Sequence, residues 1–396
     1  MKEVVKVFLK AGKEGPVKRF HPWIFSGAIA GVSANPNEGD VVECYANDGS
    51  FLAVGHFMNG SLAVKLFSFK KETIDEDFWY RKVESAFMVR QTLWLTSLEH
   101  TNAYRLIHNE GDQMPGLIVD VYGCLAVLQA HSLGMYDIRE WLANAIVKLS
   151  NGAITHVYDK SAEAIKKMTG KQVVDGFLIG NAAIMEVLEN GNKFIVNAVV
   201  GQKTGFFLDQ RESRALLARY SKDKKVLNMF GYTGGFSVYA AKAGATLVHT
   251  IDSSASAIAT ASENMLLNGF INENYACTVS DARRYLDEMP DSFYDLIILD
   301  PPAYAKNIAS RNQALKGYRS LNSHAFSKIK SGGILFTFSC SQVVDRQMFT
   351  SAVTAAAIDA GRKVRILHHL SQPADHPINI FHQEGEYLKG LVLLVE

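Results

Sequence analysis

Residues 294–302 read Tyr294-Asp295-Leu296-Ile297-Ile298-Leu299-Asp300-Pro301-Pro302, an apolar run that ends in a carboxylate and two prolines. The same layout returns at residues 333–341, where an apolar run ends in Ser339-Cys340-Ser341. Short apolar runs bounded by turn residues predict buried strands. If both strands belong to one parallel sheet, their carboxyl ends open at the same edge, where α/β sheets bind ligands. The carboxylate of Asp300 and the thiol of Cys340 would then face one pocket, and this pair suits chemistry on a pyrimidine ring.

The C-terminal half of the chain alternates predicted strands with helical patterns. Strands are expected at residues 226–230, 247–251, 275–279, 294–299, 333–338, 363–367 and 388–395. Such alternation predicts a doubly wound α/β sheet with right-handed crossovers between parallel strands. We therefore expect residues 191–396 to form one domain.

Two smaller parts are expected before this domain. Residues 1–70 contain short, turn-bounded strands, which are typical of a small β-barrel or sandwich. Residues 71–190 combine strands with an amphipathic helix predicted at 75–98, which indicates a central α/β domain. The turn-rich stretch 109–116 in this part is either a functional loop or a connector, and we favour the connector.

The composition is that of a soluble globular protein, with 48% hydrophobic and 20% charged residues among 396. No apolar run approaches the roughly 18 residues that span a bilayer, and residues 1–4 lack the layout of a signal peptide. The four cysteines are scattered, without a Cys-x-x-Cys pair. This pattern argues against a disulfide scaffold or a metal site and favours the reducing cytoplasm.

The formal net charge is only +1, but basic residues gather in one segment. Residues 301–344 contain no acid and six basic residues, which are Lys306, Arg311, Lys316, Arg319, Lys328 and Lys330. A positive segment beside the expected pocket could neutralise the phosphates of a nucleic acid. The alternative is a solvated helix face, and charge alone does not separate the two interpretations.

A glycine-rich turn follows the first strand of the sheet, at Gly231, Gly234 and Gly235. Glycines at a strand-to-helix turn let a ligand approach the backbone closely, although the spacing is not the Gly-x-Gly-x-x-Gly of dinucleotide sites. Asp252 follows the second strand, where a carboxylate can hold a ribose diol, and Asp281 follows the third. Together these features predict a nucleotide-like cofactor.

The order of the glycine turn, Asp252, Asp281 and Asp300-Pro301-Pro302 resembles a class I S-adenosylmethionine-dependent methyltransferase. More specific segments are residues 201–211, 232–236, 339–341, 375–377 and 385–390. With them, the whole chain resembles the bacterial large-subunit ribosomal RNA 5-methylcytosine methyltransferases of the RlmI (YccW) type. Members of that family begin with a PUA domain, followed by a central α/β domain and the methyltransferase domain. The resemblance implies S-adenosyl-L-methionine as cofactor, large-subunit (23S) ribosomal RNA as partner and a homodimer.

The resemblance also implies roles for single residues. Cys340 would be the nucleophile, and Asp300 would hydrogen-bond the pyrimidine. Asp252 would bind the ribose, while Asp281 and Ala282 would bracket adenine. The full set expected to bind the cofactor is Phe206, Leu208, Asp209, Arg211, Phe230, Gly231, Tyr232, Thr233, Gly234, Gly235, Asp252, Ser253, Asp281, Ala282 and Asp300.

The need for a thiol follows from the low reactivity of the cytosine ring. The position-5 carbon of cytosine is a poor nucleophile, and addition of a thiolate at position 6 makes methyl transfer feasible through covalent catalysis. A thiol that acts in this way is helped by nearby positive charge, for which Lys306 is a candidate. Many RNA 5-methylcytosine enzymes carry a second cysteine directly after the two prolines, and Ala303 stands there in this chain. The base that removes the position-5 proton is not assigned, and the candidates are Asp375, Glu384 and Glu386.

Other interpretations stay open at this point. An Asp-Pro-Pro turn also serves enzymes that methylate a guanine nitrogen without a thiol, and a 5-methyluridine enzyme would use the same cysteine chemistry. Cys340 could instead be a buried strand residue, as is expected for Cys44, Cys124 and Cys277. Tyr304 would either stack on a base or pack on the sheet. Outside the enzymes, the alternative is a noncatalytic RNA-binding or ribosome assembly factor.

Overall fold

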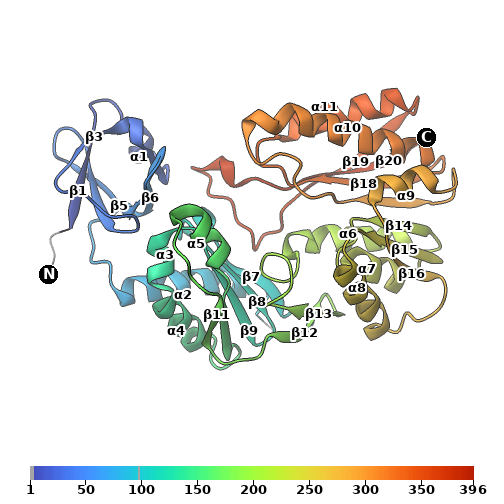
Figure 1. Ribbon diagram of the computed structural model, residues 1–396, viewed down its shortest axis with the longest axis horizontal. Coiled ribbons are helices and arrows are strands. Elements are labelled where there is room, and N and C mark those ends of the chain that lie inside the picture. The colour runs from blue at the N-terminus through green and yellow to red at the C-terminus, as the bar shows by residue number, and fades with distance from the viewer. Residues whose placement is uncertain (1–3, 97–98) are drawn as a thin grey trace. The chain divides into compact units, whose positions relative to one another are not determined.

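The computed structural model describes residues 4–96 and 99–396, and the chain forms two compact units. Unit 1 contains Met1–Leu188, Val196–Phe206 and Ala374–Gly385. Unit 2 contains Glu189–Ile195, Phe207–Pro373 and Glu386–Glu396. Each unit has its own sheets and helices, which Figure 1 shows in a ribbon diagram.

The first sheet of unit 1 consists of short strands in which buried and partly exposed residues alternate. Its strands are β1 (Val5–Leu9), β2 (Trp23–Phe25), β3 (Ile29–Val32), β4 (Val41–Tyr45), β5 (Phe51–Phe57) and β6 (Leu62–Ser68). They follow the order β2-β6-β5-β4-β1-β3, in which only β1 and β4 are paired in parallel. Side chains at alternate positions, such as Val7, Val42 and Val64, form a core with 0% exposure. The short strands at residues 1–70 thus form the small β-sheet structure that the sequence predicts.

The second sheet of unit 1 has the order β11-β10-β9-β8-β7. Its strands are β7 (Ala103–His108), β8 (Leu117–Tyr122), β9 (Leu125–Ala130), β10 (His156–Asp159) and β11 (Gly176–Ile179). The helices of this part are α2 (Glu76–Thr92), α3 (Leu133–Asp137), α4 (Arg139–Leu149) and α5 (Ala162–Thr169). Helix α2 begins after Asp75, whose side chain accepts a hydrogen bond from Phe78 N at 2.9 Å. The helix is therefore shorter than the prediction of 75–98, and residues 97–98 lie outside the described residues.

The stretch 109–116 contains a short 3-10 helix, η2 (Asn109–Asp112), and a buried ion pair fixes it. Arg90, with 0% exposure, donates to both carboxylate oxygens of Asp112, at 2.5 and 2.8 Å. Arg90 also donates to Asp375 O at 2.7 Å, and Asp375 in turn accepts a hydrogen bond from Arg105 N at 3.0 Å. These bonds explain why Ala374–Gly385 belongs to unit 1, although it lies far along the chain, because a buried arginine is tolerated only when its donors are satisfied.

Unit 2 is organised around one seven-stranded sheet with the order β16-β15-β14-β17-β18-β20-β19. Its strands are β14 (Lys225–Met229), β15 (Leu247–Asp252), β16 (Tyr275–Val279), β17 (Leu296–Leu299), β18 (Gly333–Ser339), β19 (Val364–Ser371) and β20 (Lys389–Val395). The first five are parallel to one another, and β20 runs antiparallel to both β18 and β19. All seven strands lie at the positions expected from the sequence, with ends that differ by a few residues.

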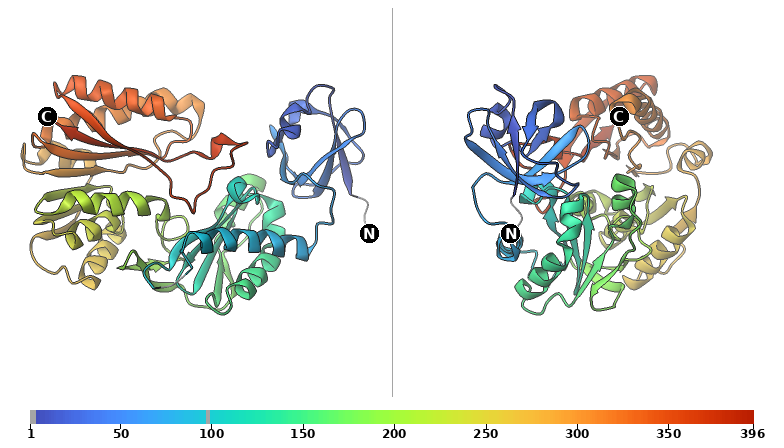
Figure 2. Two further views of the ribbon diagram at one scale, coloured as in Figure 1. Left: turned by 180° about the vertical axis from the view of Figure 1, so that it is seen from behind. Right: turned by 60° about the vertical axis from the view of Figure 1, so that its left-hand side comes forward.

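Helices cover both faces of this sheet, as the strand–helix alternation predicts (Figure 2). Helices α9 (Ala282–Glu288), α10 (Arg311–Lys328) and α11 (Arg346–Asp359) pack together, and α6 (Arg211–Ser221), α7 (Gly235–Lys242) and α8 (Ala255–Leu267) form the other layer. Strands β12 (Ile184–Glu189) and β13 (Asn192–Asn197) form a two-stranded sheet, of which Glu189–Ile195 belongs to unit 2 and the rest to unit 1. Among the helices that the structure describes, none combines the length and apolar character needed to cross a membrane.

Candidate active site

Two neighbouring strands bring the predicted carboxylate and thiol to the same edge of the sheet. Strands β17 and β18 pair in parallel, with Leu296 opposite Ile334 and Leu299 opposite Thr337. Beyond the strand ends, Cys340 Sγ lies 3.9 Å from Pro301 O, the carbonyl that directly follows Asp300. Both Asp300 and Cys340 are half-buried. The two strand ends are therefore neighbours, and the thiol is not sealed in the core.

Buried hydroxyl groups lie on either side of this thiol. Ser339 and Ser341 both have 0% exposure. Ser341 Oγ lies 2.9 Å from the hydroxyl of Tyr318 in α10 and accepts a hydrogen bond from Ala305 N at 3.2 Å. These bonds connect the loop after β17 with the loop after β18, so they hold the two strand ends together.

A buried lysine, which the sequence analysis did not single out, lies beneath the same loop. Lys389 Nζ donates to Ser341 O and to Tyr387 O, both at 2.8 Å. Burial lowers the pKa of Lys389 to about 8, while the Glu386 carboxylate, and Cys340 when it is ionised, act in the opposite direction. The available sequence signal was a lysine at the start of an otherwise apolar strand.

The glycine turn after β14 has an unusual backbone. Phe230 and Tyr232 adopt left-handed conformations with φ of 57° and 47°, and Gly234 follows with φ of 79°. Bulky residues rarely adopt positive φ, and such strain is concentrated at functional sites. A Cβ atom on Gly231 would lie 2.5 Å from Thr250 Cγ2, so only glycine fits between the turn and β15.

Asp252, at the end of β15, holds this turn through its carboxylate. Its Oδ2 accepts a hydrogen bond from Tyr232 N and its Oδ1 accepts one from Ser254 N, both at 2.9 Å. Each carboxylate oxygen has a further lone pair, so the same group can also accept the two hydroxyl hydrogens of a ribose. Ser253 is exposed beside it.

The predicted adenine residues line a pocket of about 480 Å³. Asp281 caps α9 by accepting a hydrogen bond from Arg284 N at 3.0 Å. The ring of Tyr304 lies 4.8 Å from that of Tyr318 and packs on α10. Other lining residues include Phe230, Ala282, Leu286 and Gly317. A flat heterocycle flanked by apolar and aromatic side chains fits this lining.

The segment before α6 supplies further predicted residues. Leu208 and Arg211 are buried, with 1% and 3% exposure. Asp209 Oδ2 accepts a hydrogen bond from the hydroxyl of Tyr387 at 2.8 Å. Phe206 belongs to unit 1, where its N–H donates to the hydroxyl of Tyr122 at 3.2 Å. The cofactor roles of these residues stay predictions.

The remaining members of the glycine turn are mostly enclosed. Thr233 is 7% exposed, and its carbonyl accepts a hydrogen bond from Asn264 Nδ2 at 2.8 Å. Gly235 is buried and begins α7. The turn is therefore held from β15 and from α8 at once.

The three acids considered as proton-abstracting bases lie in different surroundings. Asp375 has 0% exposure and is bonded within unit 1. Glu384 lies 3.7 Å from His382 Nε2, also in unit 1. Glu386 pairs with Arg346 at 2.8 Å in unit 2. None of these contacts selects one acid as the base.

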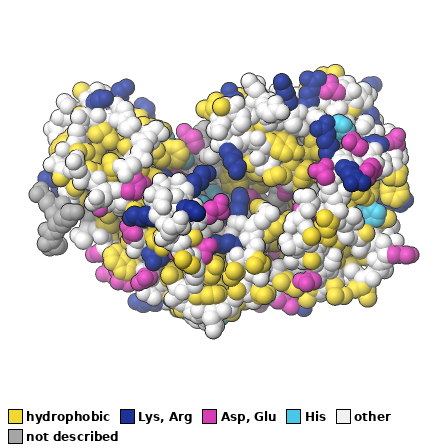
Figure 3. Space-filling model, viewed as in Figure 1, with side chains coloured by type: hydrophobic (Ala, Val, Ile, Leu, Met, Phe, Trp, Pro, Cys, Tyr) yellow, Lys and Arg dark blue, Asp and Glu magenta, His cyan; other side chains and the backbone are white. Residues whose placement is uncertain are grey.

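The acid-free segment 301–344 is less positive than its sequence suggests, because acids from outside the segment neutralise half of its charges. Arg319 pairs with Asp359, Lys328 with Asp291 and Lys330 with Asp295, at 2.6, 2.7 and 2.8 Å. Basic and acidic side chains are likewise intermixed on the face shown in Figure 3.

The other three basic side chains of this segment are Lys306, Arg311 and Lys316, for which no ion pair exists among the described residues. Lys306 and Lys316 are exposed, and Arg311 is half-buried at the start of α10. These three positions, rather than all six, are the ones left to meet an anion.

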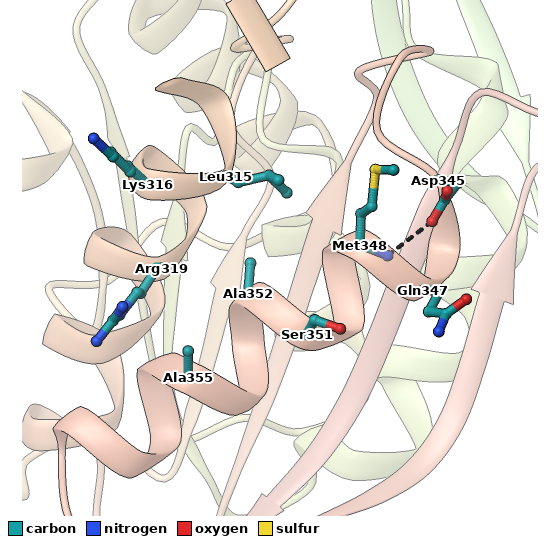
Figure 4. A pocket seen from close by; sticks show the side chains of 9 residues that line it. All are labelled: Leu315, Lys316, Arg319, Asp345, Gln347, Met348, Ser351, Ala352 and Ala355. Carbon is teal, nitrogen blue, oxygen red and sulfur yellow. Dashed lines mark hydrogen bonds between the residues drawn. The ribbon is translucent and has the colours of Figure 1, made fainter. Parts of the chain in front are cut away.

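A second pocket, of about 530 Å³, lies between α10 and α11 (Figure 4). Its wall contains Leu315, Lys316 and Ala352, and Asp345 beside it accepts a hydrogen bond from Met348 N at 2.7 Å. None of the cofactor or catalytic residues expected from the sequence lines this pocket. The candidate site is therefore the strand-end edge and not this helix layer.

Comparisons with known proteins agree with this architecture. A PUA-like domain model matches residues 7–69, and a model described as S-adenosylmethionine-dependent methyltransferase matches residues 173–377. The chain is 38% identical over 392 residues to ribosomal RNA large subunit methyltransferase I of Alteromonas mediterranea, covering 98% of each chain. It is 40% identical over 400 residues to the protein of the same name from Shewanella frigidimarina, covering 99% of each.

Solved structures show the same fold. A structure described as a SAM-dependent methyltransferase from Streptococcus mutans superposes with a TM-score of 0.83 at 23% identity, covering 99% of this chain and 100% of that one. A methyltransferase structure in complex with SAH superposes with a TM-score of 0.84 at 24% identity, with the same coverage.

Proposed function

This chain belongs to the S-adenosylmethionine-dependent methyltransferases of the ribosomal RNA large subunit methyltransferase I family, and we propose that it forms 5-methylcytosine in 23S ribosomal RNA. The reaction would proceed through a covalent adduct with Cys340. The single observation that carries this proposal is the position of the Cys340 thiol, half-buried and 3.9 Å from Pro301 O at the neighbouring strand end.

The thiol is a nucleophile in this proposal. The Cys340 thiolate adds to the position-6 carbon of the cytosine, and a sulfur–carbon bond forms while the electrons of the ring double bond move toward position 5. When bound, S-adenosylmethionine supplies the electrophilic methyl group for that carbon. A base then removes the position-5 proton, the ring double bond returns, and the sulfur–carbon bond breaks to release Cys340 as thiolate.

Asp300 would orient the ring for this addition. A carboxyl group beside the pyrimidine edge can accept a hydrogen bond from the exocyclic amine or, when protonated, donate one to the ring as negative charge develops. Its place directly before Pro301 puts it at the same edge as Cys340. The three acids discussed above stay equal candidates for the base.

The residues of the other strand ends would hold the cofactor. Asp252 can accept the ribose hydroxyl hydrogens, and the pocket lined by Asp281, Ala282 and Phe230 has room for adenine. The left-handed turn at Phe230 and Tyr232 would pass along the methionine part. These residues together therefore fit a nucleoside with a polar tail.

Ribosomal RNA is the proposed partner, on the basis of the relatives' names and the PUA-like match at residues 7–69. The target carbon is inaccessible in a stacked helix, so the base must be unpaired or flipped out of the stack. Lys306, Arg311 and Lys316 are the basic side chains proposed to meet flanking phosphates. A cytoplasmic location follows from such a substrate.

The decisive experiment combines a variant with base-resolved sequencing. Cys340→Ala is expected to abolish methyl transfer to ribosomal RNA while S-adenosylmethionine affinity, measured by calorimetry, stays within about twofold. Cys277→Ala, at a half-buried cysteine on β16, is the matched control and should retain activity. Bisulfite sequencing of 23S RNA from cells with and without the gene should reveal one cytosine that loses its protection.

Two results would overturn the proposal. Methylation retained by Cys340→Ala would favour the guanine-nitrogen chemistry, which needs no thiol. Unchanged bisulfite protection throughout 23S RNA would exclude this RNA as the cytosine substrate.

A further inference from the structure

Lys389 is a buried cation at the point where three strands meet. It begins β20 and lies opposite Ser339 in β18 and opposite Ser371 in β19. Only 2% of the residue is exposed. The next residue is Gly390, where the backbone of β20 lies close against β18. A Cβ atom at this position would come within 2.6 Å of the Phe338 ring, so glycine is needed here.

The ammonium group of Lys389 is bonded to neutral partners. It donates to the carbonyls of Ser341 and Tyr387, both at 2.8 Å. Within the described part of the chain, no carboxylate forms an ion pair with it. Burying a charge without a counter-charge costs free energy, so this lysine needs an explanation beyond its two hydrogen bonds.

Four ionisable groups act on the lysine from the surrounding elements. Glu386 and Asp345, and Cys340 when it is ionised, favour the ammonium, and Arg346 opposes it. Glu386 is itself paired with Arg346, and Asp345 is exposed and caps α11. Cys340 differs from these acids, because the ammonium is bonded to the carbonyl of the residue next to it.

We propose that Lys389 is a positioning residue that holds Cys340 as a thiolate, a role that rests on the proposed covalent function. The thiol proton leaves to bulk water, the ammonium keeps its protons, and no bond forms between the two side chains. A positive charge beside a thiolate favours the ionised form. Through its bond to Ser341 O, the same lysine also fixes the loop that carries the sulfur.

The same charge would assist the end of the reaction. When the sulfur–carbon bond breaks, its electron pair returns to Cys340, and a less basic thiolate leaves faster. The chain carries Ala303 at the position where many related RNA enzymes have a second cysteine. Lys389 thus stabilises the sulfur both as nucleophile and as leaving group.

The test measures the thiol itself, without RNA or methyl transfer. The full-length protein is treated with iodoacetamide between pH 5 and pH 10, and alkylation of each cysteine is followed by mass spectrometry of its peptide. Lys389→Met, which removes the charge, should slow alkylation of Cys340 at pH 7 by roughly tenfold. Lys389→Arg, which keeps the charge, should stay within about threefold of the wild type.

Cys277 serves as the internal reference, because three strands (β15, β14 and β17) separate its strand β16 from β18 in the sheet. Its alkylation rate should be the same in all three proteins. An unchanged Cys340 rate in Lys389→Met would overturn the proposal. So would an equal loss in Lys389→Arg, since the lysine would then act only by its hydrogen bonds.

A reciprocal measurement covers the case in which Lys389→Met does not fold. In Cys340→Ser, loss of the thiolate should move the pKa of Lys389 further below about 8, as followed by NMR of the lysine ε-carbon. An unmoved lysine titration would contradict the pairing. Negative results in the alkylation and titration experiments would overturn the role of Lys389 without contradicting Cys340-dependent methylation. Methyl transfer by Cys340→Ala would instead overturn the covalent function without contradicting the interaction between Lys389 and the Cys340 thiolate.

Discussion

The two halves of the seven-stranded sheet build their strand ends by different means. At β14 and β15 the backbone supplies the geometry, with Phe230 and Tyr232 in left-handed conformations and Asp252 bonded to main-chain N–H groups. At β17, β18 and β20 buried side chains supply it, with Tyr318 and Lys389 bonded to the loop that carries the thiol.

The difference explains which residues each half needs. A backbone-built site depends on a few neighbouring positions, so glycine spacing and one acid describe it. A site built from side chains depends on residues that the fold brings together, such as Ser341 and Lys389, which are 48 positions apart. Under the proposed function, the first half would hold the cofactor, and the second half would hold the groups that change their charge during the reaction.

The largest effect is expected at the carboxylate of the cofactor half. Asp252→Ala removes the acceptor for the Tyr232 N–H and the proposed acceptor for the ribose hydroxyls, and hydrogen bonds to a charged group contribute roughly 1.5–3 kcal/mol each. S-adenosylmethionine affinity should fall by about 100-fold in calorimetry. Asp252→Asn, which keeps one acceptor, should lose less, and equal affinities for all three proteins would refute the assignment.

The tight contact of the glycine turn should appear as a loss of stability. Gly231→Ala places a Cβ 2.5 Å from Thr250 Cγ2, and overpacking of this kind costs about 1–3 kcal/mol of unfolding free energy. Urea unfolding measures it. Adding Thr250→Ser, which removes the opposing methyl, should recover part of the loss, and no recovery would place the strain elsewhere in the turn.

The buried lysine of the other half should make stability depend on pH. Burial lowers the pKa of Lys389 to about 8 from an unfolded value near 10.5, so between these values the unfolded chain binds more protons. Unfolding free energy should therefore rise with pH from about 8 to about 10.5 and be insensitive to this group below pH 8. The contribution of Lys389 is the difference in unfolding free energy between the wild type and Lys389→Met at each pH. A difference that does not change between about pH 8 and about pH 10.5 would contradict the lowered pKa of Lys389.

A moderate effect is expected for RNA binding by the unpaired cations. Lys306→Ala with Arg311→Ala should weaken binding of a 23S fragment by about tenfold and reduce the slope of affinity against salt by about one per lost phosphate contact. S-adenosylmethionine binding should not change. If the two substitutions leave RNA affinity unchanged, the RNA binds to another surface of the protein.

The smallest effect is expected for the neutralised cation on the same helix. Arg319→Ala breaks an exposed pair with Asp359, and such pairs contribute about 0–1 kcal/mol. Its RNA affinity should stay within about twofold of the wild type. A loss as large as that of the Lys306 and Arg311 variant would mean that pairing does not decide which cations meet phosphate.

Much of unit 2 was predictable from local pattern. Strand positions follow from short apolar runs, and strand–helix alternation predicts that Asp300 and Cys340 lie at the same edge of one parallel sheet. That β17 and β18 are direct neighbours was implied only by the family resemblance, and the structure shows it. The positive character of residues 301–344 was overestimated, because the acids that neutralise Arg319, Lys328 and Lys330 lie outside that segment. The three-part division at residues 70 and 190 and the homodimer stay predictions.

The sequence by itself determined where the strands of unit 2 lie along the chain, the glycine turn and the acids at the strand ends, since each depends on residues within a few positions of one another. Only the tertiary structure decided that Lys389 lies under the thiol loop, that Ala374–Gly385 is bonded into unit 1, and which cations are already paired. The physical reason is that burial and charge pairing depend on distance in space, and a fold makes neighbours of residues that no local spacing relates.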